Sequence, residues 1–193
     1  MRDCDQNPQL RPLLHLATEE EIKSSEPEMT ICWGTSISPF GNLFVARTKR
    51  GIIQLSFFED EPTEAQQMMR SDWPNALRSR DNTMAQEISS QTFSRRTPQE
   101  RPQLHIKGTD FQIAVWRALV DIPAGTLSTY GRIAHQLGRP GAARAVGNAV
   151  SKNRIAFLLP CHRVVRENGE IGDFRWGTER KRQMIKAEHT FEA

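Results

Sequence analysis

Cys161 lies in the segment FLLPCHRVVRENG (residues 157–169), where an apolar run ends at Pro160 and His162 and Arg163 follow the cysteine. Cationic neighbours lower the pKa of a thiol and favour the reactive thiolate. Adjacent residues of an extended chain point to opposite sides, so His162 would reach the sulfur only through a water or a turned backbone. The segment alone is compatible with a nucleophile or with a small buried apolar side chain.

The other uses of a cysteine are less consistent with the sequence. The 193 residues include three cysteines, Cys4, Cys32 and Cys161, and this odd, sparse set argues against a disulfide framework. No CxxC motif or Cys/His cluster suggests zinc, so we expect neither a metal nor a cofactor. A cysteine in a reducing compartment stays a free thiol and remains available for chemistry.

An acidic residue near the C-terminus is a candidate partner for His162. Residues 178–191, TERKRQMIKAEHTF, are predicted to form a helix on which Met184, Ile185 and Glu188 share one face. Glu188 could orient His162 in an acid–base–nucleophile relay, or it could be an edge carboxylate that reaches water. The spacing does not choose between these two interpretations.

Three helices are predicted to position Cys161 in the second half of the chain. They are expected within residues 108–123, 128–138 and 139–153, the first with Phe111, Val115, Leu119 and Ile122 along one face and the second ended by Gly138. The last two, joined by a tight turn, resemble a helix-turn-helix. The last one carries Arg144 among Ala, Gly and Val, either as a probe of DNA or at the rim of a tight helix pair.

The first half has a different pattern. Residues 1–28 are polar with three prolines and are predicted to be a mobile tail. Residues 42–57 contain two β-rich runs joined at 49–51, a hairpin signal, and short helices are expected at 61–70 and 81–93 before a polar linker at 94–102. We therefore expect an α/β (α+β) protein with a small α/β domain at 29–102 and a mainly helical domain at 103–193.

Charge and hydropathy limit the partners. Residues 1–108 carry 13 Lys+Arg and 15 Asp+Glu, a net charge of −2, whereas residues 109–193 carry 13 and 8, a net charge of +5. A basic half that contains Cys161 is compatible with a polyanionic partner. No apolar run approaches the ~20 residues of a membrane span, and the polar N-terminus does not resemble a signal peptide. We expect a cytoplasmic, monomeric protein with no membrane partner.

Several motifs together resemble one family. GTDFQIAVWRAL, RPGAARAVGNAVSKN and IAFLLPCHRVVRENGEIGDFRWG make residues 108–188 similar to the catalytic domain of O6-alkylguanine-DNA alkyltransferases, also called methylated-DNA–protein-cysteine methyltransferases. The DFRWG segment is most similar to the C-terminal half of Ada-type proteins. Residues 29–107 resemble the family's N-terminal domain more loosely, which implies a ribonuclease H-like fold for 29–102.

The resemblance implies a direct-reversal repair reaction. Cys161 would accept, irreversibly and once, the alkyl group of O6-alkylguanine or O4-alkylthymine in double-stranded DNA. His162 would be the base, acting through a water, and Glu188 would orient it. Asn153 matches the asparagine that shapes the turn around the cysteine.

The resemblance also implies a set of DNA contacts. Tyr130 would help to rotate the target nucleotide and donate toward the leaving guanine, and Arg144 would fill the gap left by the extruded base. Gly131 and Arg139 fall at positions that approach the DNA backbone. Alternatives are a non-catalytic protein that binds alkyl lesions, a transcription regulator that reads base sequence, and a cysteine hydrolase that turns over.

Trp176 generates a prediction about substrate size. It lies where mammalian members have a small residue, on the segment that walls the family's alkyl pocket, unless it is a core residue that points away. If it narrows the site, the protein accepts methyl groups well and benzyl groups poorly, because a close-packed site does not absorb an extra indole. Trp176→Gly should then react about tenfold or more faster with O6-benzylguanine and little faster with the methylated base. Fast benzyl transfer by the wild-type protein would contradict this.

Overall fold

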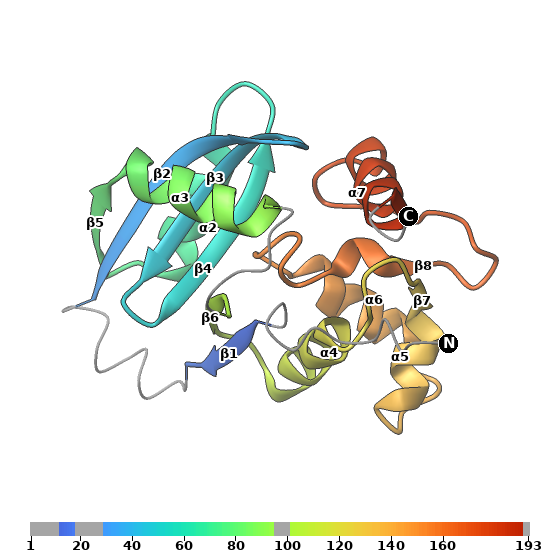
Figure 1. Ribbon diagram of the computed structural model, residues 1–193. Helices are drawn as coiled ribbons and strands as arrows, with labels where there is room; N and C mark the ends of the chain where they lie inside the picture. The colour runs from blue at the N-terminus through green and yellow to red at the C-terminus, as the bar shows by residue number, and fades with distance from the viewer. Residues whose placement is uncertain (1–11, 18–28, 95–100, 191–193) are drawn as a thin grey trace. The chain divides into compact units, whose positions relative to one another are not determined.

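The computed structural model describes residues 12–17, 29–94 and 101–190 of the chain (Figure 1). The chain divides into two compact units, the first ending at Lys107 and the second beginning at Gly108. The first unit is built on a β-sheet flanked by helices, and the second is mainly helical. This confirms the predicted fold class.

The strands of the first unit form a six-stranded sheet. Its members are β1 (Leu13–Leu16), β2 (Thr30–Ser38), β3 (Gly41–Thr48), β4 (Gly51–Phe58), β5 (Leu77–Arg80) and β6 (Gln103–Ile106), in the spatial order β1-β6-β4-β3-β2-β5. Thr48 pairs with Gly51, so Lys49 and Arg50 make a two-residue turn. This is the hairpin that the sequence predicted.

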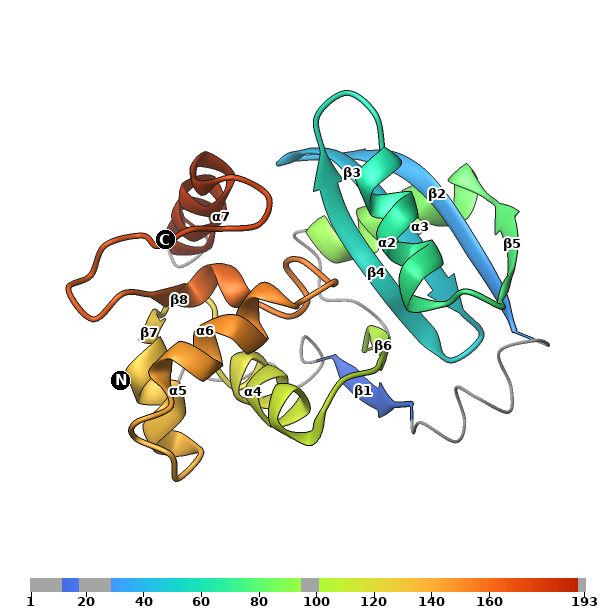
Figure 2. The same ribbon diagram turned by 180° about the vertical axis from the view of Figure 1, so that it is seen from behind.

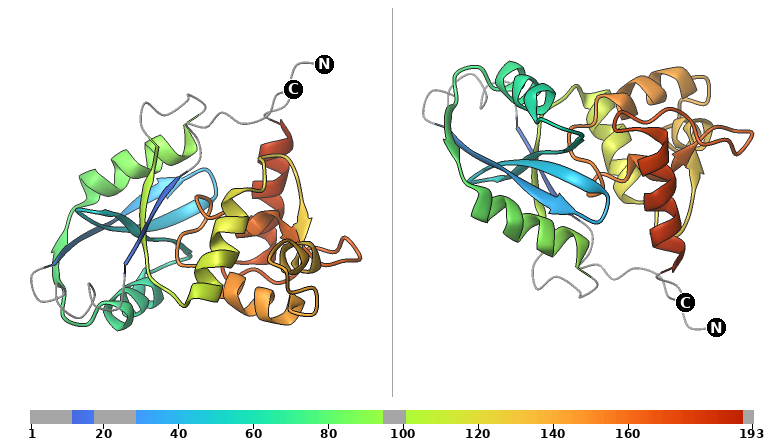
Figure 3. Two further views of the ribbon diagram at one scale, coloured as in Figure 1. Left: turned by 90° about the horizontal axis from the view of Figure 1, so that it is seen from below. Right: turned by 90° about the horizontal axis from the view of Figure 1, so that it is seen from above.

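Two helices cover opposite faces of this sheet, α2 (Thr63–Asp72) and α3 (Asn82–Phe93), as Figure 3 shows. The side chain of Asp81 caps α3 by accepting a hydrogen bond from the backbone N–H of Met84 at 3.0 Å. Because both faces of the sheet are covered, β4 is buried from Gly51 to Phe57 rather than alternating between buried and exposed residues.

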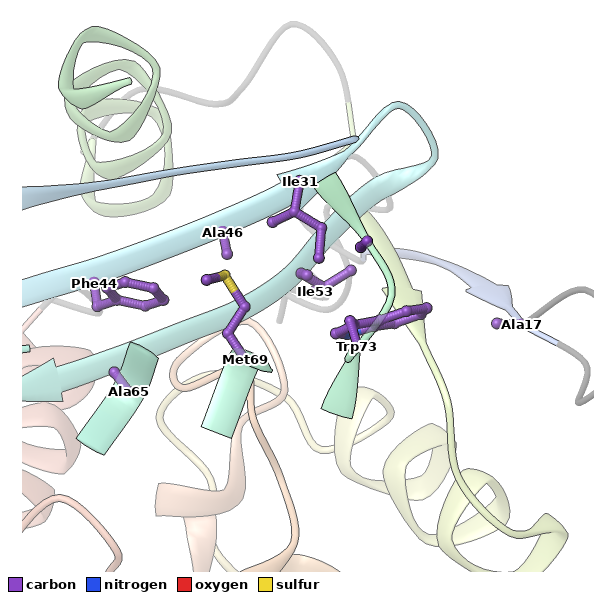
Figure 4. Close-up of a cluster of buried hydrophobic side chains, with 9 residues drawn as sticks. Ala17, Ile31, Phe44, Ala46, Ile53, Ala65, Met69 and Trp73 are labelled. Carbon is purple, nitrogen blue, oxygen red and sulfur yellow. The ribbon is translucent and has the colours of Figure 1, made fainter. Parts of the chain in front are cut away.

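The core on the α2 face is a single apolar cluster (Figure 4). Strand residues of β2, β3 and β4 meet residues of α2 and of the turn after it; the labelled members are Ala17, Ile31, Phe44, Ala46, Ile53, Ala65, Met69 and Trp73. Ala17, the residue after β1, belongs to the cluster.

Two boundary predictions were wrong. Residues 13–16 were assigned to a mobile tail, but they form β1, which pairs in parallel with β6. Residues 103–107 were assigned to the second domain, but β6 lies in the sheet of the first unit. Each strand has only four residues and pairs with strands far away in the sequence, β1 with β6 across about 90 positions and β6 also with β4 across about 50, a relation that local pattern does not show. Residues 1–11 and 18–28 of the expected tail, and residues 95–100 of the expected linker, lie outside the described residues.

The second unit contains the predicted helices, with two short strands and a 3-10 turn between them (Figure 2). The elements are α4 (Asp110–Val120), β7 (Ser128–Thr129), α5 (Tyr130–Gln136), α6 (Ala143–Ser151), η3 (Cys161–Arg163), β8 (Val164–Val165) and α7 (Thr178–Thr190). Thr109 and Gln112 form a capping box at the start of α4. Within the described part of the chain, no helix has the length and hydropathy needed to cross a bilayer.

The α5 and α6 pair has helix-turn-helix connectivity and packs with α4. Thr129 caps α5 through its side chain, and Gly138, at φ +69°, takes the left-handed conformation just beyond the helix end. β7 and β8 pair in parallel, Thr129 opposite Val165. The start of α5 is therefore fixed next to the strand that follows Cys161.

Gly34 generates a stability prediction for the first unit. A Cβ at this position of β2 would lie 2.3 Å from the carbonyl oxygen of Asp81, where the chain passes from β5 into α3. Because backbone atoms cannot move aside as a side chain can, Gly34→Ala should lower the free energy of unfolding by about 1–3 kcal/mol. Urea unfolding measures this, with Gly141→Ala as the control, since a Cβ there meets nothing within 4 Å. Equal stability of the two variants would contradict the prediction.

Candidate active site

The backbone around Cys161 is turned rather than extended. Pro160, at φ −77° and ψ 60°, lies at the centre of a γ-turn that is closed by a 2.7 Å hydrogen bond from the Cys161 N–H to the Leu159 carbonyl. The 3-10 turn η3 follows, and the Arg163 N–H bonds to the Pro160 carbonyl at 3.0 Å. Cys161 and His162 are both buried, 3% and 0% exposed. The backbone is therefore turned at this point, but among the described residues no direct hydrogen bond joins His162 to the sulfur.

Asn153 holds both this turn and the sulfur. Its side-chain Nδ2 lies 3.2 Å from the Ile155 carbonyl, 3.0 Å from the Leu159 carbonyl and 3.1 Å from Cys161 Sγ. Its Oδ1 accepts from the Ile155 N–H at 2.8 Å. A single buried amide therefore satisfies the backbone of the loop and also reaches the thiol.

Glu188 reaches His162 from α7. His162 Nε2 lies 2.8 Å from Glu188 Oε1. A carboxylate only accepts hydrogen bonds, so Nε2 carries the proton and donates it. His162 Nδ1 is buried and has no hydrogen-bond partner among the described residues. Of the two interpretations of Glu188, the structure shows the carboxylate that contacts the histidine, only 5% exposed.

Arg163 holds the same carboxylate, a contact that the sequence did not predict. Its Nη2 lies 2.8 Å from Glu188 Oε1 and its Nε lies 3.0 Å from Oε2. Its Nη1 donates to the Ile122 carbonyl just beyond α4. Arg163 thus connects η3, α7 and the end of α4 around one buried acid.

Burial and these contacts determine the protonation states. Burial raises the pKa of Glu188, but the hydrogen bonds from His162 and Arg163 outweigh it and hold that pKa at about 2. Burial lowers the pKa of His162, with Glu188 acting in the opposite direction. An ionised acid therefore faces a neutral imidazole whose Nδ1 can accept a proton.

The thiol is in its neutral form when the site is at rest. Burial raises the pKa of Cys161 to about 11, against the opposing effects of the Asn153 hydrogen bond and of the positive charges on Lys181 and Arg175. A neighbouring base is therefore needed to remove its proton at neutral pH, and the nearby cations favour the thiolate once it forms.

Lys181 is a site residue that the sequence analysis missed. It is 1% exposed, and its Nζ donates to the Val164 carbonyl at 2.7 Å. Burial lowers its pKa, whereas the Cys161 thiolate would raise it. A signal was present, because Lys181, Met184 and Glu188 are spaced three and four residues apart, which places all three on the buried face of α7.

Tyr130 is within electrostatic range of the sulfur. It is the first residue of α5, and burial, followed by the charge of the Cys161 thiolate, raises its pKa. A Cβ on Gly147 would lie 3.8 Å from its ring, and one on Gly172 would lie 3.6 Å from its hydroxyl. The structure therefore brings Tyr130 to the same site as Cys161, Asn153, His162 and Glu188.

The predicted DNA contacts lie on α5, α6 and the turn between them. Arg144 is exposed in the first turn of α6. The Gly131 N–H donates to Glu167 Oε1 at 3.0 Å, and the Arg139 guanidinium lies over the Phe111 ring at 5.4 Å. In this structure Gly131 and Arg139 therefore have contacts within the protein, and their role at DNA stays a prediction.

Two further features bear on the site. Trp176 is 6% exposed and meets Phe174 edge-on, with 5.2 Å between ring centroids, so whether it narrows an alkyl site stays a prediction. Among residues 12–17, 29–94 and 101–190, no three His, Cys, Asp or Glu side chains gather as a metal site would require.

The chain is similar to proteins of known family. A family model described as "6-O-methylguanine DNA methyltransferase, DNA binding domain" matches residues 110–190. The methylated-DNA–protein-cysteine methyltransferase of Methanosarcina mazei is 35% identical over 154 residues, 78% of this chain and 92% of the relative. The bifunctional transcriptional activator/DNA repair enzyme Ada of Escherichia coli is 34% identical over 178 residues, 89% of this chain and 49% of the relative.

The chain is also similar to solved structures of methyltransferases. The O6-methylguanine methyltransferase of Mycobacterium tuberculosis is 32% identical with a TM-score of 0.66, over 83% of this chain and 93% of that one. The same organism's OGT in complex with DNA is 31% identical, also with a TM-score of 0.66, over 83% and 94%. The chain spans about half the length of the first curated relatives that it matches, 49% of the Ada protein and 52% of a Mycobacterium bovis methyltransferase.

The Glu188 pKa generates a prediction about stability and pH. The folded-state pKa lies below the ordinary value of 4.5, so the stability that Glu188 contributes is present above about pH 4.5 and is lost as the pH falls toward about 2. Glu188→Gln should therefore be less stable than wild type at neutral pH, and the difference should narrow across this window.

Urea unfolding at several pH values measures this difference. Glu179→Gln on the same helix is the matched control, since Glu179 is 70% exposed and pairs only with Arg182 among the contacts described. It should change stability little at any pH. A Glu188→Gln deficit that stays constant down to pH 2 would mean that Glu188 is not held ionised by its partners.

Proposed function

The chain belongs to the family of methylated-DNA–protein-cysteine methyltransferases, and we propose that it repairs DNA by moving an alkyl group from O6-alkylguanine onto Cys161. The observation that carries this proposal is the buried thiol held by Asn153 next to the His162–Glu188 pair. The same residues lie within the 110–190 segment that matches the family model. No cofactor takes part in the proposed reaction.

The reaction is a single displacement. The thiol gives its proton to His162 Nδ1 through a water, while the hydrogen bond to Glu188 stabilises the imidazolium that forms. The sulfur then attacks the alkyl carbon, so that a C–S bond forms as the bond from carbon to O6 breaks. Guanine leaves with the electron pair, Tyr130 donates toward it, and the proton lost by the thiol balances the one that guanine gains. The thioether product is stable, so each molecule acts once.

Double-stranded DNA is the proposed partner. An alkylated O6 is stacked inside the duplex, so the nucleotide must rotate outward at a cost of a few kcal/mol. Arg144, exposed on the small-residue helix α6, is proposed to fill the space that it leaves. O4-alkylthymine is the proposed second substrate. We further propose that the protein acts as a monomer in the cytoplasm.

The alternative functions do not need all of the groups that surround Cys161. A protein that only binds lesions, or one that reads base sequence, needs neither a buried thiol nor a neutral histidine beside it. A cysteine hydrolase would need a water positioned to release the bound group. The Asn153, Lys181 and Arg175 influences on Cys161 support a sulfur that ionises during the reaction.

The test is a substitution of the acceptor. Cys161→Ser should abolish removal of the methyl group from a duplex with one O6-methylguanine, because the hydroxyl is a far poorer nucleophile in the same position. DNA affinity should stay near that of wild type. Cys32→Ser, at a half-buried thiol of the first unit, is the control and should react normally. Methyl removal by Cys161→Ser at the wild-type rate would overturn the proposal.

A further inference from the structure

Phe157 has a strained backbone three residues before Pro160. It is the one non-glycine residue with positive φ in the described part of the chain, at +65°. The Leu158 N–H bonds to the Ala156 carbonyl at 2.7 Å, which makes Phe157 the centre of a γ-turn of the rare, positive-φ kind. A bulky residue in this region costs about 1–3 kcal/mol, whereas glycine adopts it freely. The backbone strain of an aromatic residue at this position must therefore be offset by another contact.

The ring stacks on His162. The two ring centroids are 5.5 Å apart and the planes differ by 8°, an offset parallel arrangement. The strained turn is what directs the side chain of Phe157 back toward the residue that follows Cys161. His162 is fully buried, and the Phe157 ring lies partly over one face of its imidazole.

The stack restricts the orientation of the His162 ring in a way that its hydrogen bond to Glu188 does not. The contact from Nε2 to Glu188 fixes one atom of the imidazole, but the ring can still pivot about that contact. A parallel aromatic plane removes this freedom and fixes the direction of Nδ1, the atom with no hydrogen-bond partner among the described residues. A misdirection of a catalytic group by about 1 Å can cost on the order of 100-fold in rate.

The charged groups around His162 do not provide the same constraint. Glu188 approaches from α7 at the Nε2 edge, Arg163 follows in η3, and Lys181 acts from α7. The neutral thiol of Cys161 directly precedes His162 in the chain. Among the contacts described for His162, the stack with Phe157 is the one made against a face of the imidazole, so it is the contact that can define the ring plane.

We propose that Phe157 is a positioning residue for His162, a stacking plane that orients its Nδ1 toward the thiol proton and keeps water from the imidazole face. The inference rests on the proposed function, because it assigns His162 the role of base. Leucine, which is smaller and not planar, would leave part of the imidazole face open to water, and glycine would relieve the strain. Neither could hold the ring plane.

The test compares Phe157→Leu with Phe157→Tyr, which keeps the aromatic plane. In ¹⁵N-histidine-labelled full-length protein, NMR titration reports the pKa and tautomer of His162, and single-turnover assays report alkyl transfer as a function of pH. Burial lowers the His162 pKa. Phe157→Leu should let water reach the imidazole, so the His162 pKa should rise toward its ordinary value of 6.5. A base acts only above its pKa, so the acid limb of the rate profile should move to higher pH.

We expect transfer by Phe157→Leu to be about tenfold slower at neutral pH, and Phe157→Tyr to resemble wild type in both measurements. An unchanged His162 titration in Phe157→Leu, or equal losses in the Leu and Tyr variants, would overturn the proposal. If Phe157→Leu is too unstable to titrate, Phe157→Gly, which accepts the positive φ without strain, replaces it under the same criteria. The titration needs no DNA, so it decides this inference even if wild type proves unable to transfer an alkyl group.

Discussion

The site depends on the hydrogen bonds that the buried carboxylate of Glu188 accepts. It accepts hydrogen bonds from His162 and from Arg163, and Arg163 also binds the carbonyl that follows α4. An ionised acid that is 5% exposed would be strongly destabilising without these partners. The end of α4, the turn η3 and α7 must therefore all be in place before the charge is compensated. Burial lowers the pKa of His162 against the opposing effect of this acid, so the imidazole is neutral, with Nε2 toward the acid and Nδ1 unbonded among the described residues.

Cys161 is held within this frame in a form that does not react readily by itself. Burial keeps the thiol protonated, while Asn153, Lys181 and Arg175 favour loss of the proton. A thiol of this kind is protected from adventitious electrophiles and becomes a nucleophile when a base is directed at it. That combination suits the proposed role of Cys161 as an acceptor used once, because a wasted acceptor could not be regenerated.

Much of the arrangement could be predicted from local sequence. The Thr109 cap, the Lys49–Arg50 turn and the shared face of Met184 and Glu188 follow from spacing and residue type. The strands β1 and β6 could not be predicted in this way, because each pairs across about 90 residues. Buried Lys181 was overlooked because lysine is rarely buried. The left-handed turn at Phe157 has no signal in its own residue type, which favours negative φ.

The fate of the methyl group tests the central claim most directly, because the account assigns it to one sulfur and to one event. A duplex that carries O6-methylguanine with an isotopically labelled methyl group would be mixed with less than an equimolar amount of protein. Peptide mass mapping and analysis of the solvent would then locate the label. The account predicts one labelled methyl per protein, on the peptide that contains Cys161, and one unmodified guanine in the DNA for each methyl transferred. Label released to solvent, label on another residue, or removal beyond one equivalent would contradict it.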